Sequence, residues 1–225
     1  MPIILKDLTD KFGLTLSKSV KWGESINSAG CGLYFVTITS DPKKLVSWDQ
    51  PEIDSTSIDD WIELVRSHGK EITIDNQPAD QQMIMNRFSK LWLRDETILY
   101  IGKAGPNTNR PIRKRVNEYY KTKLGCNKKH AGGHWINVLS KISQLNVFHS
   151  DFSESDYHKI EDVEEKLIGY FSRSVSESAK ETLIDSANCF PFANKEIHLR
   201  SERKKVTKAH GFGNQTVYCG SKWKK

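Results

Sequence analysis

The stretch ILYIGKAGPNTNRPIRKRVNEYY, residues 98–120, joins a strand pattern to a helix pattern through a polar loop. Its first five residues, Ile98–Gly102, are aliphatic and aromatic, which is typical of a buried strand. Glycine, asparagine and proline are frequent in Lys103–Arg110, a composition that favours a loop. Pro111 then stands where helices favour proline, in their first turn. We therefore predict a strand, a loop and a helix in this order.

Similar patterns on either side of this stretch predict the remaining elements. Strands are expected at Leu33–Thr39 and Leu145–Ser150, and a short one at Glu71–Asp75. Helices are expected at Ser57–His68, Ala79–Arg94, Trp135–Ile142, Asp156–Val175 and Ala179–Asn188. The first of these helices would begin with a capping pattern at Ser57 and Asp60. With three main strands and many helices, the chain fits an α+β fold, a small sheet covered by helices.

Length and composition limit the classes of protein that this chain can belong to. It has 225 residues and a mass of 25.8 kDa, which is ample for a hydrophobic core. No apolar run approaches the ~20 residues that span a bilayer, and the first residues lack the pattern of a secretory signal. We therefore expect a cytoplasmic protein that does not enter the membrane. Four widely spaced cysteines predict neither a disulfide framework nor a zinc ribbon.

Charge is distributed in blocks along the chain. Residues 102–141 carry ten basic and one acidic side chain, and residues 195–225 carry nine basic and two acidic ones. Residues 41–97 and 151–186 are acidic, with net charges of −5 and −6. Basic blocks interleaved with aromatic residues suit a phosphate backbone, although a solvated surface of mixed charge is the alternative interpretation.

One carboxylate on the helix predicted at 156–175 lies on the wrong face. A helical wheel places Val163, Leu167 and Phe171 on an apolar stripe, and Glu164 falls inside that stripe. A carboxylate there loses hydration unless it is paired or binds a cation. Glu164 is therefore a candidate metal ligand or acid–base group, and an ion-paired glutamate at the stripe edge is the structural alternative.

The helix that follows Pro111 has a similar feature. Ile112, Val116 and Tyr119 form its apolar face, and Arg115 flanks that face. Arg115 and Tyr119 are four residues apart, so their side chains can meet. An arginine beside a phenol suits the binding of an anion. The structural alternative is an arginine at the edge of the apolar face, with the aliphatic part of its side chain packed on that face.

Taken together, these residues resemble the GIY-YIG nuclease family. Gly32-Leu33-Tyr34 and Tyr100-Ile101-Gly102 resemble its two half-motifs, and Lys103 follows directly. Residues 112–119 are similar to the family's arginine helix, with Arg115 at the position of the catalytic arginine. Glu164-Glu165-Lys166-Leu167-Ile168 matches its glutamate segment, and Pro191–Asn194 resembles its terminal element. The resemblance runs from about residue 30 to residue 194 and implies a three-stranded antiparallel sheet flanked by helices.

The resemblance also implies an activity, namely hydrolysis of a DNA phosphodiester with Mg²⁺ or Mn²⁺ as cofactor. The catalytic residues that it implies are Tyr34, Tyr100, Lys103, Arg115, Tyr119, Glu164 and Asn194. Glu164 would hold the metal, Arg115 would bind the phosphate, and Tyr34 would activate water as the base. Because the reference pKa of tyrosine is about 10, Lys103 or Arg115 is expected beside Tyr34 to lower it. Asn194 would tie the glutamate helix to the sheet.

Two departures from the family pattern define further expectations. Some 65 residues separate the two half-motif tyrosines, so residues 41–96 are interpreted as an insertion. Tyr119 stands where many members have histidine, although related restriction enzymes in the family also use tyrosine. The domains expected are an N-terminal extension (1–29), a nuclease-like domain (30–196) and a basic tail (197–225).

Several basic residues are predicted to bind nucleic acid. They are Arg113, Lys114, Lys128, Lys129, His130, His134, Lys204 and Lys205. A zinc site built from Cys126, His130 and His134 is a weaker alternative, because Gly132 and Gly133 interrupt a helix there. We expect a restriction-like DNA endonuclease acting on duplex DNA, with a homodimer as a further expectation. The alternatives are a catalytically silent DNA-binding module and a structure-specific repair or recombination nuclease.

Overall fold

The computed structural model describes residues 2–105, 110–127, 131–199 and 202–219. Its helices are α1 (Leu5–Lys11), α2 (Ser55–Arg66), α3 (Gln81–Ser89), α4 (Ile112–Tyr120), α5 (Ile160–Ser174) and α6 (Glu177–Lys180). Three 3₁₀ segments, η2 (Ala131–Val138), η3 (Ile142–Gln144) and η4 (Glu154–Lys159), complete the helical part. The strands are β1 (Val20–Lys21), β2 (Gly32–Thr37), β3 (Thr73–Ile74), β4 (Gln77–Pro78), β5 (Ile98–Ala104), β6 (Asn146–Asp151), β7 (Glu196–Leu199), β8 (Lys204–Thr207) and β9 (Phe212–Gly213).

The main sheet has four strands in the order β1-β6-β2-β5, and its pairs are antiparallel. The expected α+β class is therefore confirmed, but the expected count of three strands is wrong. The two-residue strand β1 adds the fourth, where Val20 pairs with Val147 of β6. So short a strand has no periodic pattern that a sequence could reveal. Strand β5 lies at the edge of the sheet, so one side of it is open to other elements.

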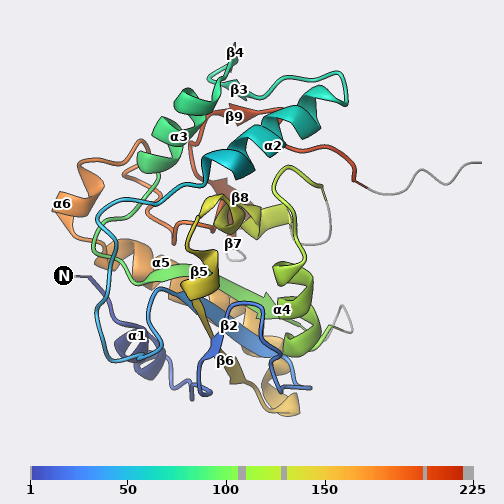
Figure 1. Cartoon of the computed structure of the whole chain (residues 1–225). Helices are drawn as coiled ribbons and strands as arrows, with labels where there is room; N and C mark the ends of the chain where they lie inside the picture. Colours follow the sequence, from blue (N-terminus) through green and yellow to red (C-terminus); the bar gives the residue numbers. More distant parts are fainter. Residues whose placement is uncertain (1, 106–109, 128–130, 200–201, 220–225) are drawn as a thin grey trace, which may run out of the picture.

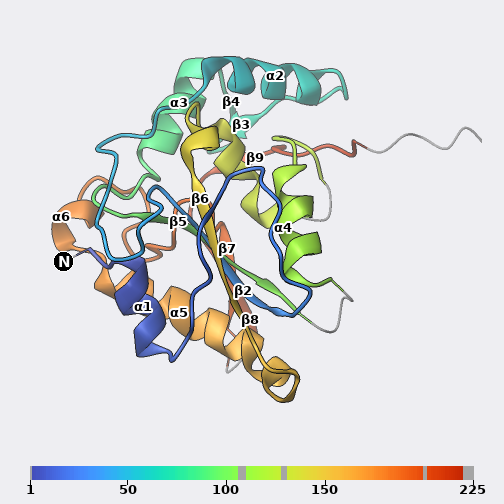
Figure 2. The same cartoon turned by 60° about the horizontal axis from the view of Figure 1, so that its bottom comes forward.

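Helices cover both faces of the main sheet (Figures 1 and 2). Strand β2 is buried on both sides because its side chains alternate between two hydrophobic clusters. Tyr34 and Val36 belong to the cluster that includes residues of α2, α3 and α4. Leu33 and Phe35 belong to the cluster that includes residues of α1 and α5.

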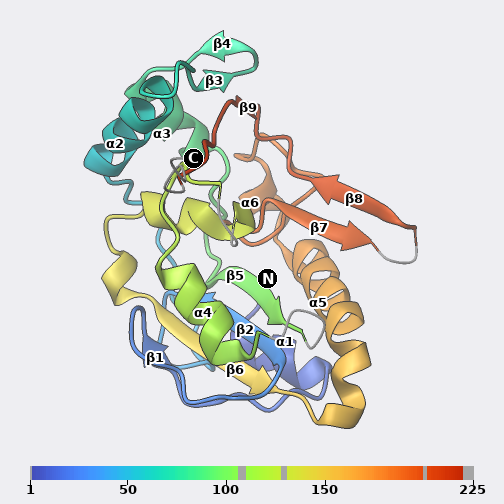
Figure 3. The ribbon, with the colours of Figure 1, turned by 90° about the vertical axis from the view of Figure 1, so that its right-hand side faces the viewer.

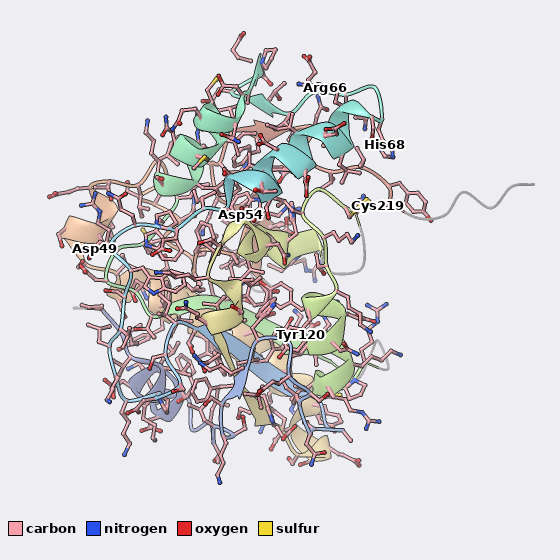
Figure 4. The ribbon with its side chains drawn as sticks, in the orientation of Figure 1. Asp49, Asp54, Arg66, His68, Tyr120 and Cys219 are labelled. Carbon is pink, nitrogen blue, oxygen red and sulfur yellow. A yellow bond between two sulfur atoms is a disulfide. The ribbon has the colours of Figure 1, made fainter. Side chains whose placement is uncertain are left out.

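Several helix bounds differ from the sequence expectation. Helix α2 is capped by Asp54, which is labelled in Figure 4, and not by the expected Ser57 pattern. The Asp54 carboxylate accepts a hydrogen bond from the backbone N–H of Thr56 at 3.1 Å. The helix predicted at 179–188 is reduced to α6. The Asp185 carboxylate instead accepts from the backbone N–H groups of Asn188 and Ala209, which fixes a turn. The helix predicted from Trp135 is the 3₁₀ segment η2.

The basic tail is largely built into the fold up to residue 219. Strands β7 and β8 form an antiparallel hairpin, and β9 pairs with β3 of the insertion. The Trp61 indole on α2 donates to the backbone O of Gln215 (2.8 Å). These contacts join the tail to residues 41–96. No local sequence pattern predicts such a long-range pairing. The tail residues 220–225 lie outside the described part.

A disulfide links Cys126 to Cys219, contrary to the expectation from cysteine spacing. The two residues are 93 positions apart in the sequence, so no local motif pairs them. The backbone of Cys126 also forms an isolated parallel β-bridge with that of Val217. The tail therefore lies beside the loop that follows α4, where Figure 4 labels Cys219. Cys31 and Cys189 are buried free thiols. No helix in the described residues is both long and apolar enough to cross a membrane.

Candidate functional site

A cavity of about 220 Å³ lies along the open edge of β5. Figure 3 shows the elements around this edge, with α4 on one side of β5 and α5 and the β7–β8 hairpin on the other. Five of the seven predicted catalytic residues line the cavity, namely Tyr100, Lys103, Arg115, Glu164 and Asn194. Residues up to 94 positions apart in the sequence therefore meet in one place.

Glu164 is paired with a lysine inside this cavity. The Nζ of Lys103, on β5, lies 2.8 Å from Oε2 of Glu164 and 3.5 Å from Oε1 of Glu161. Burial raises the pKa of the Glu164 carboxyl, and the positive charge of Lys103 opposes that rise. Glu161, on the same helix, therefore also approaches Lys103. The ion pair matches the structural alternative for Glu164, and the cavity still exposes the carboxylate to a ligand.

Arg115 projects from α4 into the same cavity. Its guanidinium lies 3.6 Å from the Glu118 carboxylate, one turn further along the helix. Glu118 is half-buried and also pairs with Arg110 at 3.6 Å. A guanidinium held this way presents a fixed group of donors, which suits the oxygens of an anion.

Three tyrosines pack together beneath the cavity. The ring centroid of Tyr100 lies 5.8 Å from that of Tyr34 and 4.8 Å from that of Tyr119. Tyr34 and Tyr119 are fully buried, whereas Tyr100 is slightly exposed and lines the cavity. The Tyr34 hydroxyl shares a hydrogen bond with Tyr100, and the Tyr119 hydroxyl donates to the backbone O of Gly133 (3.0 Å).

The expected lowering of the Tyr34 pKa is not found. Burial raises the pKa of Tyr34 well above its ordinary value, and the charge of Arg115 opposes this only in part. Lys103, one of the two cations expected beside Tyr34, is paired with Glu161 and Glu164. Burial likewise raises the pKa of Tyr100 to about 12. At neutral pH the tyrosines are therefore hydrogen-bonding phenols.

The two half-motif glycines are required for close packing. Tyr34 pairs with Gly102 across the strands, and a Cβ on Gly102 would lie 2.5 Å from a ring carbon of Tyr100 and 2.7 Å from the Tyr34 hydroxyl. A Cβ on Gly32 would lie 2.1 Å from the backbone O of Ser150. Each distance is below van der Waals contact, so any side chain at either position would displace the tyrosines or β6.

Asn194 ties the chain after Pro191 to the open edge of the sheet. Its side-chain O accepts from the backbone N–H of Ile101 (2.9 Å), and its side-chain N donates to the backbone O of Ile101 (2.8 Å). Two backbone groups of the edge strand are thereby satisfied. The expected role in holding elements together fits this geometry, although the partner is β5.

Apart from His134, the residues predicted to bind nucleic acid fall into three groups. Arg113 and Lys114 are exposed on α4, and Lys204 and Lys205 are exposed on β8. Lys205 pairs with Glu196 at 2.9 Å, and a second cavity, of about 700 Å³, is lined by Lys103, His198, Arg203 and both β8 lysines. The predictions for Lys128, Lys129 and His130 lie outside the described residues.

His134 is buried, so the prediction that it contacts nucleic acid is wrong. Its Nδ1 faces the backbone N–H of Gly125 at 3.4 Å, and its Nε2 lies 3.1 Å from Nζ of Lys195. Burial, together with the charge of Lys195, lowers the pKa of His134 to about 3, so the ring is neutral. The zinc alternative is unsupported, because Cys126 is in a disulfide and no cluster of three metal-binding side chains occurs in the described residues.

Lys195 is the main residue of this site that the sequence patterns did not identify. It directly follows Asn194 and lines the cavity with Arg115 and Glu164. Its position next to the terminal motif was the available signal, but its approach to His134 depends on contacts 61 residues apart.

Comparisons with known proteins identify no relative of this chain: no family model, no curated protein and no solved structure matches it.

Proposed function

We propose that this protein is a metal-dependent DNA endonuclease of the GIY-YIG type that hydrolyses phosphodiester bonds. The observation that carries the proposal is one cavity that is lined by a partly buried carboxylate, Glu164, together with the guanidinium of Arg115 and the phenol of Tyr100. The antiparallel strands β6, β2 and β5, with Tyr34 opposite Gly102, support the same assignment. A carboxylate that can hold a metal ion and a guanidinium that can bind phosphate oxygens are groups that support phosphodiester hydrolysis.

Glu164 is the residue that would hold a divalent cation. Its carboxylate opens into the cavity, and Glu161 lies close enough to share Lys103 with it. One carboxylate with waters and substrate oxygens is a normal environment for Mg²⁺, which keeps much of its hydration. When bound, the cation supplies positive charge that stabilises the charge developing on the phosphate.

Arg115 would bind a non-bridging oxygen of the scissile phosphate. Its pairing with Glu118 fixes the guanidinium before substrate arrives, and preorganised donors stabilise a transition state without reorganisation. Lys103 favours the ionised form of Glu164, because its positive charge opposes the rise in pKa that burial causes.

Tyr100 is the tyrosine that can contact a water in the cavity, since Tyr34 and Tyr119 are fully buried. We assign Tyr100 the task of orienting the attacking water and Tyr34 that of orienting Tyr100. This replaces the expected role of Tyr34 as the base, because burial raises its pKa.

Duplex DNA is the substrate that the exposed charges support best. Basic side chains stand on both sides of the cavity, on α4 (Arg113, Lys114) and on β8 (Lys204, Lys205). A duplex placed over the edge of β5 could contact both groups through its phosphates, with a strong dependence on salt.

The test is incubation of supercoiled plasmid with the purified protein in Mg²⁺ and in EDTA. Glu164→Gln should lose cleavage by at least about 1,000-fold, whereas Asp162→Asn, at an exposed carboxylate of the same helix outside the cavity lining, should keep most of it. Equal cleavage by the wild-type protein and Glu164→Gln would refute the proposal. Binding without cleavage would favour the silent module, and a preference for branched over linear DNA would favour a repair nuclease.

A further inference from the structure

The side chain of Lys195 contacts other kinds of groups than the other cations of the cavity do. Lys103 is paired with Glu164, and Arg115 with Glu118. Within the described residues, the side-chain partners of Lys195 are neutral: His134 at 3.1 Å, Gln215 at 3.5 Å and the Trp135 ring, whose centroid is 5.6 Å from Nζ. A half-buried ammonium with neutral partners retains positive charge that an anion in the cavity can compensate.

From this arrangement we infer that Lys195 is a further phosphate-binding residue of the cavity, held in place by the neutral His134 ring. The inference rests on the proposed function for the identity of the anion, a phosphodiester of the substrate. Lys195 would donate hydrogen bonds from its charged Nζ to a non-bridging oxygen of a phosphodiester in the cavity. His134 acts through Lys195 and is a positioning residue.

Gly133 and His134, two consecutive residues of η2, support different parts of the cavity. A Cβ on Gly133 would lie 2.8 Å from the Tyr119 ring, so only glycine allows Tyr119 to pack there. The next residue, His134, is then directed at Lys195. The same segment therefore supports the tyrosine cluster through one residue and the cavity lysine through the next.

Burial lowers the pKa of Lys195 to about 8, which makes its charge sensitive to pH in a measurable range. The charged and titratable groups around it are His134 on η2, Glu196 on β7, Lys205 on β8 and His210 beyond β8. Glu196 raises this pKa, Lys205 lowers it, and both histidines are neutral near pH 7. Bound phosphate should raise the pKa of Lys195, because an anion favours the charged form of the ammonium.

A direct test uses the full chain with ¹³Cε-labelled lysine, in which the Lys195 signal is identified by its absence from Lys195→Arg. We expect this signal to titrate near pH 8 and its midpoint to move upward when inorganic phosphate is added. A midpoint that phosphate does not change would overturn the inference. This readout does not depend on cleavage, so phosphate binding without nuclease activity would refute the proposed function and leave the inference standing.

Cleavage kinetics separate an anion-binding lysine from a lysine that acts as a base. Lys195→Met should lower kcat/KM by about 10- to 100-fold at pH 7, and Lys195→Arg, which keeps the charge, should restore most of it. Above pH 8 the wild type should lose affinity while Lys195→Arg should not. The control is Lys166→Met, an exposed lysine of α5 paired with Asp162. Wild-type rates in Lys195→Met, or rates that rise through pH 8 and are lost in Lys195→Arg, would overturn the inference.

The positioning role of His134 is tested in the same spectra. His134→Phe removes the ring nitrogen that faces Lys195 and keeps an aromatic ring of similar size. We expect the Lys195 midpoint to change and KM to rise more than kcat falls, while His134→Gln, which retains an acceptor, restores part of the affinity. An unchanged Lys195 titration in a folded His134→Phe protein would contradict this role.

Discussion

The Nζ of Lys103 lies 2.8 Å from Oε2 of Glu164, so the residue that follows one half-motif on β5 neutralises the carboxylate of α5. Both groups are partly withdrawn from water, with side-chain exposures of 31% and 18%. Removing one partner leaves the other charge poorly solvated, which costs more than removing both. The pair therefore couples the edge strand to the helix that carries the candidate metal ligand.

This coupling can be measured with a double-mutant cycle. We expect Lys103→Met and Glu164→Gln each to be destabilising, with a coupling free energy of about 1 kcal/mol, since Lys103 is one-third exposed and solvent screens the pair. Urea unfolding of the four proteins gives the value. Strictly additive effects would show that the pair does not contribute to folding. The exposed pair Lys166–Asp162 on the same helix serves as the comparison and should give a smaller coupling.

Tyr34→Phe distinguishes two roles of the buried tyrosine. If Tyr34 orients Tyr100 through their shared hydrogen bond, its loss should slow DNA cleavage by about 10-fold, the value of one neutral hydrogen bond. A base would be worth about 100- to 10,000-fold. Single-turnover cleavage rates separate these ranges, and Tyr100→Phe should be the more damaging change because Tyr100 faces the cavity. A loss above 1,000-fold in Tyr34→Phe would restore its assignment as the base.

Gly102→Ala should destabilise the fold and disturb the cavity together. The added methyl would lie 2.5 Å from a Tyr100 ring carbon and 2.6 Å from a Tyr34 ring carbon. Overpacking of this kind typically costs about 1–3 kcal/mol. Gly105→Ala is the matched control, because nothing lies within 4 Å of its Cβ position and its free energy of unfolding should change little. Thermal unfolding of the two variants, measured side by side, tests the difference.

Acid should unfold the protein partly through His134. Burial lowers the pKa of His134 to about 3 from an unfolded value of about 6.5, so the unfolded chain binds the extra proton first. The stability that neutral His134 provides is complete above pH 6.5 and is lost as pH falls toward 3. The expected slope is about 1.4 kcal/mol per pH unit for this group. His134→Gln should reduce the slope between pH 6 and 4, and the exposed His68→Gln should not. An unchanged slope in His134→Gln would show that the ring is protonated at little cost.

Local patterns predicted much of the site because the residues concerned lie on strongly patterned elements. The apolar alternation of β2 and β5 and the misplaced Glu164 on α5 are visible in the sequence, and the cavity brings these elements together. The partners of those residues were harder to predict. Lys103 or Arg115 was expected beside Tyr34; the charge of Arg115 does act on Tyr34, whereas Lys103 pairs with Glu161 and Glu164.

Long-range contacts account for the remaining errors. His134 appeared to be a surface residue of a basic loop, since nothing nearby in the sequence shows that the tail covers it. Strand β9, Lys195 and the Cys126–Cys219 disulfide all come from or involve the segment after Asn194, whose strands are two to four residues long. Such strands are stabilised by partners distant in the sequence, and periodicity cannot reveal them.

The Cys126–Cys219 disulfide should contribute to both stability and the site. It closes a loop with a sequence separation of 93, and the loss of such a crosslink typically costs about 2–5 kcal/mol. Cys219→Ser should therefore lower the melting temperature, and a reducing agent should lower that of the wild type to match while leaving the variant unchanged. Alkylation under denaturing conditions followed by mass measurement should find two free thiols in the oxidised protein. The disulfide should also affect the site. The backbone N–H of Gly125, next to Cys126, faces Nδ1 of His134, so the crosslink supports the residue that positions Lys195. Reduction should therefore weaken phosphate binding at temperatures where the chain is still folded. If the Lys195 signal responds to phosphate equally before and after reduction, the disulfide does not support the site.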